Sequence, residues 1–431
     1  MTDLPILLIT GASGYIGSWI VKLALESNKY KVRGTIRGDP QDSVTNGYEY
    51  KNLKENIILN DPKYKHLKKL NEDNEGRLTL FKADLLYEEG STDKYWEKIV
   101  KGCTYIIHTA AVFKFEESRN PSELIDPAVK GTENVLNAIV MNDCLKHIVI
   151  TSSIVSIGYG FKINYDIPID EKTKTNTENS KYKIPTYFKA KALAEEKAIE
   201  MYNKKNLKGI KMSVINPGLV LGPSLSTNNC ESLQIIANIA SGKESALPDI
   251  YTYITSIKDV ANAHLLVLDK DIPTVLSLKL EICPSINIGD LDKKTDTPNR
   301  FLLAAQELSL CQISDILQKE FIQYGYKPTK KTLSNFLLSI GSLFNDKKAK
   351  AFNLIVSRKL NIKCKNVKEI LKLDIDYNIS KLINDTFYSI ISNKICKLSI
   401  NIKTKDKINE NIDRINQEYN IKLPHVIQLV N

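Results

Sequence analysis

The chain has 431 residues, of which 42% are hydrophobic and 26% are charged, as in folded globular proteins and unlike disordered chains. Its 60 lysines and arginines exceed its 50 aspartates and glutamates, and the net charge of +10 has three possible origins: an anionic partner, a lysine-rich surface, or a site for a phosphorylated cofactor. No apolar run approaches the ~18 residues that span a bilayer, and no HExxH or close histidine pair suggests a zinc site, so we expect neither an integral membrane segment nor a metal.

The beginning of the chain and its cysteines indicate a compartment. An apolar strand pattern starts almost at the first residue, so we expect no signal or transit peptide. The seven cysteines are odd in number, scattered and without a CxxC pair, so reduced thiols in the cytoplasm are the simplest interpretation. Acids and bases interleave, and no basic stripe carries stacking aromatics, so nucleic-acid binding is not expected.

Short apolar runs alternate with helix-period segments from the N-terminus to about residue 215. The helical segments are Ile16–Leu25, Gly131–Val140 and Tyr187–Asn203. Runs that are apolar throughout suit strands buried on both faces, and strand-helix alternation implies right-handed crossovers. We therefore predict an α/β fold with a doubly wound parallel sheet, whose strands are Pro5–Ile9, Lys31–Ile36, Leu78–Ala83, Tyr105–Thr109, Ile148–Ser152 and Lys211–Ile215.

Beyond Pro217 the pattern changes to loops, short strands and helices. The predicted domains are a nucleotide-binding domain over 1–217, to which some later segments return, and a smaller α/β substrate-binding lobe over 218–395 with an insertion at 273–299. Residues 396–431 form a C-terminal extension, where Ile408, Ile412, Ile415 and Tyr419 place an apolar stripe on one helix. We expect that helix to dock on the body of the chain, with an oligomer or partner contact as the alternative.

Three glycines, Gly11, Gly14 and Gly17, follow the first predicted strand and open the first helix. The first permits a tight turn, the second lets the backbone approach a pyrophosphate, and the third allows close packing of helix on strand. Unpaired N–H groups at a helix N-terminus then receive the anion. The sequence therefore predicts a dinucleotide-binding loop of the form GxxGxxG.

The end of the second predicted strand indicates which dinucleotide binds there. A residue that reads the ribose is expected about 20 residues after the last glycine, and the chain has Arg37 there instead of an acid. A guanidinium pairs with a 2′-phosphate that a carboxylate would repel, which favours NADP(H) over NAD(H). The alternative is a solvated charge at a strand end. Other strand ends place Asp84 near an adenine edge and supply small residues against which a dinucleotide can lie, at Thr109, Ala110 and Ala111.

Tyr187 and Lys191 form a YxxxK pair that shares one face of the third predicted helix. A lysine ammonium lowers the pKa of a nearby phenol from its usual value near 10, so that the phenol can exchange a proton with a carbonyl or alcohol oxygen. Ser152 and Ser153 end the fifth predicted strand, where open α/β sheets place their sites. A serine hydroxyl there can hydrogen-bond the substrate oxygen.

These motifs, in this order, resemble the extended short-chain dehydrogenase/reductases, and among them the dihydroflavonol-4-reductase-like group. The resemblance implies a Rossmann-type fold and an NADP(H)-dependent oxidoreductase that interconverts a carbonyl compound and an alcohol, acting as a monomer or homodimer. It covers about residues 5–268. The matching stretches are Gly11–Val21, Val32–Arg37, Lys82–Leu85, Gly102–Ala110, Pro127–Thr132, Thr151–Ser153, Tyr187–Ala198, Asn216–Pro223 and Lys258–His264.

The resemblance assigns roles to matching positions. Ser153 would be the active-site serine, Tyr187 the acid/base and Lys191 its partner. Phe113, Gly158 and Tyr159 would line the substrate pocket. The positions that would bind NADP(H) are Gly11, Ser13, Gly14, Tyr15, Ile16, Gly17, Arg37, Asp84, Leu85, Thr109, Ala110, Ala111, Tyr187, Lys191, Pro217, Gly218 and Val220.

Some features depart from the group or leave alternatives open. The KNWYCY-type segment of cinnamoyl-CoA reductases is absent around Pro185–Lys189, which disfavours that substrate. A 3β-hydroxysteroid dehydrogenase or a nucleotide-sugar epimerase is the alternative within the same fold, and a non-catalytic NADP-binding regulator is the alternative from another class. The apolar segment Phe336–Phe344 suits a substrate entrance or a membrane surface, but we expect a helix that faces the core.

Overall fold

The computed structural model describes residues 4–38, 48–50, 61–86, 95–110, 120–140, 142–162, 165–204, 207, 209–228, 230–269, 299–343, 347–375, 377–395 and 405–426. The chain divides into two compact units. Unit 1 comprises residues 1–217, 259–303 and 360–374, and unit 2 comprises residues 218–258, 304–359 and 375–431. None of the described helices combines the length and hydropathy needed to cross a membrane.

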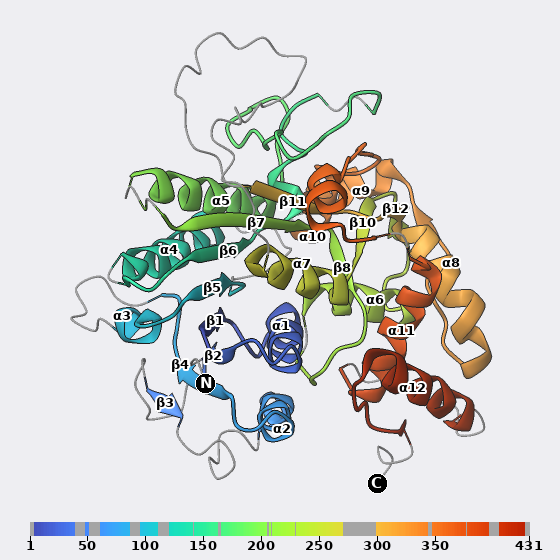
Figure 1. The fold of residues 1–431 in the computed structure, drawn as a ribbon. Helices are drawn as coiled ribbons and strands as arrows, with labels where there is room; N and C mark the ends of the chain where they lie inside the picture. The colour runs from blue at the N-terminus through green and yellow to red at the C-terminus, as the bar shows by residue number, and fades with distance from the viewer. Residues whose placement is uncertain are drawn as a thin grey trace. The chain divides into compact units, whose positions relative to one another are not determined.

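Unit 1 is built on one sheet with the order β11-β7-β6-β5-β1-β2-β4-β3 (Figure 1). Its strands pair in parallel, except that the edge strand β3 runs antiparallel to β4. All six predicted strands are present, within two residues at either end, which confirms the doubly wound parallel sheet. The strands are β1 (Ile6–Thr10), β2 (Lys31–Ile36), β3 (Glu49–Tyr50), β4 (Leu78–Lys82), β5 (Tyr105–His108), β6 (His147–Thr151), β7 (Lys211–Pro217) and β11 (Asn299–Leu303).

The helices of unit 1 connect these strands, as crossovers between parallel strands require. β2 pairs with one edge of β1 and β5 with the other, so the strand order reverses at β1. In such sheets a ligand binds beyond the carboxyl ends of the strands at that reversal. The helices are α1 (Tyr15–Glu26), α2 (Lys65–Asp73), α3 (Tyr95–Val100), α4 (Ser122–Ile139), α5 (Thr186–Lys204) and α7 (Ile257–Asp269), which starts in unit 2, with the short turns η2 (Ile154–Ser156) and η4 (Val367–Leu371).

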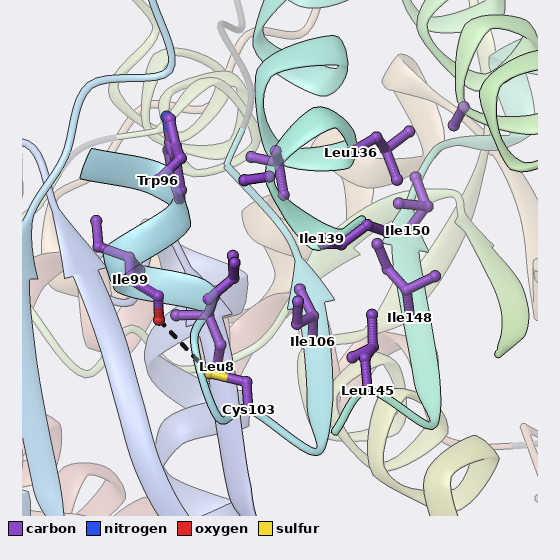
Figure 2. Close-up of a cluster of buried hydrophobic side chains, with 14 of the residues drawn as sticks. Leu8, Trp96, Ile99, Cys103, Ile106, Leu136, Ile139, Leu145, Ile148 and Ile150 are labelled. Carbon is purple, nitrogen blue, oxygen red and sulfur yellow. Dashed lines mark hydrogen bonds between the residues drawn. The ribbon is translucent and has the colours of Figure 1, made fainter. Parts of the chain in front are cut away.

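A cluster of buried apolar side chains fixes α3 and α4 to the sheet (Figure 2). Leu8, Ile106 and Ile148 come from the neighbouring strands β1, β5 and β6, and each is fully buried. Trp96 of α3 and Ile139 of α4 join the same cluster. Because the strand residues on both faces of the sheet are apolar, helices can cover both faces and hold the strand ends in place.

Unit 2 contains short strands and helices. β10 pairs in parallel with β8 and antiparallel with β12, and β9 pairs with β13. Its strands are β8 (Leu219–Leu221), β9 (Leu247–Pro248), β10 (Tyr251–Ser256), β12 (Gln306–Ser309) and β13 (Thr332–Leu333). Its helices are α6 (Glu231–Ser241), α8 (Leu310–Phe321), η3 (Ile322–Tyr324), α9 (Asn335–Leu343), α10 (Lys347–Asn353), α11 (Ile379–Ser392) and α12 (Lys405–Tyr419).

Two later segments differ from expectation. The expected insertion within the second lobe ran to residue 299, but Asn299–Leu303 forms β11 and pairs with β7 in the main sheet, so this later segment returns to the first domain. The rest of the expected insertion, up to residue 298, lies outside the described residues. The predicted helix is present as α9, and Leu338 is buried as expected, but Phe336 and Leu337 are 74% and 54% exposed, so the first turn does not face the core. Phe344 lies outside the described residues.

The C-terminal helix has the expected form. Ile408, Ile412 and Ile415 lie on one face of α12 and are fully buried, and α12 packs against α11 within unit 2. The predicted apolar stripe is therefore covered by the chain itself.

Candidate active site

The glycine loop between β1 and α1 is shaped by close backbone contacts. Gly11 has φ of +69°, a conformation that favours glycine, and its carbonyl oxygen accepts a hydrogen bond of 2.9 Å from the N–H of Gly14. A Cβ on Gly17 would lie 2.2 Å from that same oxygen. Gly14 is the N-cap of α1 and makes no side-chain capping hydrogen bond. The loop therefore brings the backbone of the first helical turn to the carboxyl end of β1 without side chains in the way.

The ends of β1 and β5 are held together beside this loop. The Thr10 hydroxyl accepts hydrogen bonds of 3.1 Å from the N–H groups of Thr109 and Ala110 and lies 2.9 Å from Nδ1 of His108. A Cβ on Gly11 would lie 3.1 Å from Cα of Ala110. Thr109 and Ala110 thus border the glycine loop, as a surface for a dinucleotide requires. Ala111 lies outside the described residues.

Two arginines of the second strand region have different surroundings. Arg33 donates to the carbonyl oxygens of Ile99 and Lys101, and its guanidinium stacks over the ring of Phe81 at 5.3 Å. Arg37 follows the carboxyl end of β2, is exposed, and has no ion-pair partner among the described residues. The arginine that is exposed at the strand end is therefore Arg37, the one that the sequence predicts to bind a 2′-phosphate.

The adenine side of the predicted site lies after β4. The side-chain oxygen of Asp84 accepts a 3.0 Å hydrogen bond from the N–H of Leu86, and its carbonyl oxygen accepts one from the Tyr95 hydroxyl. The carbonyl oxygen of Leu85 accepts a 2.7 Å bond from the Asn134 side chain. Because β4 is parallel to β2, Asp84 and Leu85 lie at the same edge of the sheet as Arg37.

Helix α5 presents Tyr187 and Lys191 one turn apart, as the YxxxK spacing predicts. Burial lowers the pKa of Lys191 to about 8, and the nearby Glu195 carboxylate opposes that shift. His108, at the end of β5, feels the Lys191 charge: burial and that charge lower the pKa of His108 to about 4. Lys191 and His108 are therefore near enough for the charge of the lysine to affect the pKa of the histidine.

Ser153 follows β6 and caps the short turn η2, against which α5 packs. Its hydroxyl donates to the carbonyl oxygen of Pro217 and accepts from the N–H of Val155, both at 3.4 Å. Bonds of that length are weak, so the hydroxyl can exchange them for a substrate oxygen. Ser152, by contrast, donates to the Glu195 carboxylate, which favours Ser153 as the serine that meets a substrate.

The remaining predicted positions are distributed as follows. Gly158 and Tyr159 are buried in unit 1: a Cβ on Gly158 would lie 2.9 Å from Cδ1 of Leu360, and the Tyr159 ring lies 4.6 Å from that of Phe188. Their role in a substrate pocket stays a prediction. Pro217 ends β7 in unit 1, and the adjoining Gly218 and Val220 belong to unit 2. Phe113 lies outside the described residues.

Sequence reasoning missed two polar residues of this region. Glu195 stands one further turn along α5 on the face of Tyr187 and Lys191, so continuation of the four-residue spacing was an available signal. Arg300 lies in β11, and its guanidinium Nη2 is 2.5 Å from Oε1 of Glu195. Nothing in the local sequence pattern pairs residues so far apart in the chain.

Comparison with known proteins gives consistent matches. The model of the NAD dependent epimerase/dehydratase family matches residues 7–278. The chain is 38% identical over 266 residues to cinnamoyl-CoA reductase CAD2 of Medicago truncatula, covering 61% of this chain and 72% of that protein. It is 34% identical over 266 residues to tetraketide alpha-pyrone reductase 1 of Arabidopsis thaliana, with the same two coverages.

The solved structures it resembles show the same fold. The yeast methylglyoxal/isovaleraldehyde reductase Gre2, solved with NADPH, matches with a TM-score of 0.62 at 19% identity, covering 90% of this chain and 99% of that one. Vestitone reductase from alfalfa matches with a TM-score of 0.59, also at 19% identity, covering 91% and 99%. The predicted resemblance to extended short-chain reductases and the predicted fold are thus confirmed.

Proposed function

The chain belongs to the NAD dependent epimerase/dehydratase family, and from that premise we propose that it is an NADP(H)-dependent oxidoreductase that interconverts an aldehyde or ketone and an alcohol. The observation that carries the proposal is α5, which holds Tyr187 and the half-buried Lys191 one turn apart next to the turn of Ser153. The reductases among its relatives support the same reaction class.

The residues at the sheet edge suit NADP(H). The glycine loop has no room for a Cβ at Gly17 and turns α1 toward the strand ends, which fits a pyrophosphate. Arg37 is exposed without an ion-pair partner among the described residues, which fits a 2′-phosphate. When bound, the nicotinamide supplies or accepts the hydride.

The side chains of the chain then handle the proton. Tyr187 donates its phenolic proton to the substrate oxygen as the carbonyl carbon receives the hydride, and takes the proton back in alcohol oxidation. The ammonium of Lys191 stabilises the resulting tyrosinate, which requires that Lys191 stay protonated despite a pKa lowered to about 8. Ser153 donates a hydrogen bond to the same substrate oxygen and stabilises its developing charge.

Replacement of Tyr187 tests this assignment. Tyr187→Phe removes the proton donor but keeps the ring, so we expect turnover to fall at least about 100-fold, the contribution of a positioned acid, while NADPH binding changes little. Tyr182→Phe, five residues earlier and outside the helix, is the matched control and should retain turnover. Oxidation of NADPH would be followed at its absorbance with a panel of aldehydes and ketones. Retained turnover in Tyr187→Phe shows that another group is the acid.

The alternatives differ in their cofactor and chemistry. A nucleotide-sugar epimerase keeps its dinucleotide bound through the cycle, so identification of the dinucleotide that copurifies separates it from a reductase; Arg37 favours NADP(H). A non-catalytic NADP-binding regulator would bind NADPH yet leave it unoxidised with every carbonyl compound. The chain retains both Tyr187 and Lys191, which supports the enzyme.

Further details belong to the same proposal. The substrate is a small carbonyl compound or alcohol whose identity is set by the second lobe, and the names of the relatives do not transfer at 30–38% identity. We propose a cytoplasmic location on the grounds of the scattered cysteines given above. A monomer or homodimer is proposed from the family resemblance alone.

A further inference from the structure

A buried carboxylate ties the predicted catalytic helix to the serine turn. Glu195 of α5 is 2% exposed, and its Oε2 accepts hydrogen bonds from the Ser152 hydroxyl and, at 2.9 Å, from Nδ2 of Asn216. Its Oε1 lies 2.5 Å from Nη2 of Arg300, which is equally buried. The partners come from the end of β6, from β7 and from β11, so one side chain joins three strands to α5.

The same contacts fix the backbone of Ser153. Nδ2 of Asn216 also donates to the carbonyl oxygen of Ser153 at 3.2 Å, and the N–H of Ser152 donates to the carbonyl oxygen of Ile215 at 2.8 Å. The Ser153 hydroxyl itself has only its two weak bonds of 3.4 Å. The position of the Ser153 hydroxyl therefore depends on its backbone. The Glu195 carboxylate fixes that backbone through its hydrogen bonds with Ser152 and Asn216.

Arg300 is anchored independently of the catalytic helix. Its Nη1 donates to the carbonyl oxygen of Thr173 at 2.7 Å, and its own carbonyl oxygen accepts from Nδ2 of Asn366 at 2.8 Å. The N–H of Asn366 in turn donates to Oε1 of Glu171 at 2.7 Å. A buried charge is costly unless it is paired, and Arg300 pairs with Glu195 from a rigid strand.

We propose that Glu195 is a positioning residue for the reaction: its carboxylate, paired with Arg300, sets the Ser153 turn relative to α5 and keeps a negative charge one helical turn from Lys191. The inference rests on the proposed function. It adds a pair of residues that do not touch the substrate but determine where Ser153 lies and how readily Lys191 stays protonated.

The charge of Glu195 has a measurable consequence. The described titratable and charged groups around Lys191 and Glu195 are Tyr187 and Glu195 itself on α5, His108 of β5 and Arg300 of β11. His108 is neutral at pH 7 because its pKa is lowered to about 4. Among the described residues, Glu195 is the anion that raises the Lys191 pKa, and Glu195→Gln removes that charge. Lys191 then loses its proton at lower pH, and the alkaline limb of the reduction rate moves to lower pH.

The test compares Glu195→Gln with Glu196→Gln, the neighbouring and partly exposed carboxylate that pairs with Lys174. For Glu195→Gln we expect kcat to fall by about 10- to 100-fold, as for a small misplacement of reacting groups, with KM for NADPH unchanged and the alkaline limb shifted to lower pH. Glu195→Asp keeps the charge, so it should restore the limb and recover only part of kcat. Glu196→Gln should change none of these quantities.

A double variant and a labelling measurement extend the test of Glu195. Because Glu195→Gln leaves the Arg300 cation unpaired, Glu195→Gln/Arg300→Gln removes both charges and serves if the single variant does not fold; it should show the same shift of the limb. The pH dependence of Lys191 acetylation by a small reagent, read by mass spectrometry, reports the lysine without turnover. If the wild-type protein reduces no carbonyl compound, the proposed function fails, and the labelling then tests separately whether the Glu195 charge keeps Lys191 protonated. A folded Glu195→Gln protein with the kcat, pH limb and labelling of Glu196→Gln overturns it.

Discussion

At the scale of single residues, two arginines from one strand region have opposite roles although their sequence surroundings are alike. Arg33 donates hydrogen bonds to carbonyl oxygens of unit 1, whereas Arg37 follows the end of β2 and is exposed. The spacing from the glycines identified Arg37 correctly as the residue at the strand end. What it does with a phosphate follows from charge and geometry and is open to direct measurement.

We expect Arg37→Ala to weaken NADPH binding and leave NADH binding unchanged, because in the proposed binding mode the guanidinium meets only the 2′-phosphate. A charge-assisted hydrogen bond contributes about 1.5–3 kcal/mol, which corresponds to a rise of about 10- to 100-fold in Kd for NADPH. Fluorescence titration with both dinucleotides measures the ratio directly. Arg37→Lys keeps a cation and should lose less. Equal weakening for both dinucleotides would mean that Arg37 supports the loop and does not read the phosphate.

Residue-scale prediction from the sequence succeeded where a short motif carries its own physical reason. Gly17 had to be glycine because a Cβ would strike the Gly11 carbonyl, and Tyr187 with Lys191 needed only helical periodicity to share a face. Glu195 and Arg300 could not be paired from the sequence, because α5 and β11 are far apart in the chain and their contact exists only in the folded sheet.

At the scale of elements, apolar periodicity predicted the six central strands and the C-terminal helix but missed β11. That strand opens with Asn299 and Arg300, both buried, and polar residues at its start made the run look like the end of a loop. In the first turn of α9 the expected burial is wrong for the converse reason. An apolar run predicts burial only when a neighbouring element covers it, and Phe336 and Leu337 stay exposed.

Helix α12 makes a testable contribution to unit 2. Ile412 is fully buried on its inner face, while Asp385 of α11, also fully buried, pairs with Arg414 at 2.6 Å and Lys381 at 2.9 Å. We expect Ile412→Ala to lower the free energy of unfolding by about 2–5 kcal/mol, the usual loss for a large buried aliphatic side chain. Urea denaturation followed by circular dichroism measures it. Gln417→Ala, on the exposed face of α12, is the control and should change little; similar losses for both would show that the loss does not come from packing of the buried face.

At the scale of the whole molecule, the histidines are unevenly distributed between the two units. Four of the five lie in unit 1, at positions 66, 108, 147 and 264, and burial lowers the pKa of each to about 4. Both tryptophans, Trp19 and Trp96, are also buried in unit 1. Tryptophan fluorescence therefore reports the unit in which these histidines are held neutral. Of the many cations that give the net charge of +10, the proposed function uses one exposed arginine, Arg37, to bind the 2′-phosphate.

This distribution predicts that unit 1 loses stability as the pH falls from about 6.5 toward 4. In the unfolded chain each histidine titrates near pH 6.5. Below that pH the unfolded state binds protons that the folded state does not bind, so the free energy of unfolding decreases as the pH is lowered. Each buried histidine contributes a slope of up to about 1.4 kcal/mol per pH unit. Urea titrations followed by tryptophan fluorescence at several pH values measure the slope. His147→Asn should reduce it by about one proton, whereas Ser213→Ala, which removes only the 2.9 Å hydrogen-bond partner of His147, should lower stability at every pH and keep the slope. A slope unaffected by His147→Asn would show that this histidine is protonated in the folded protein as readily as in the unfolded chain.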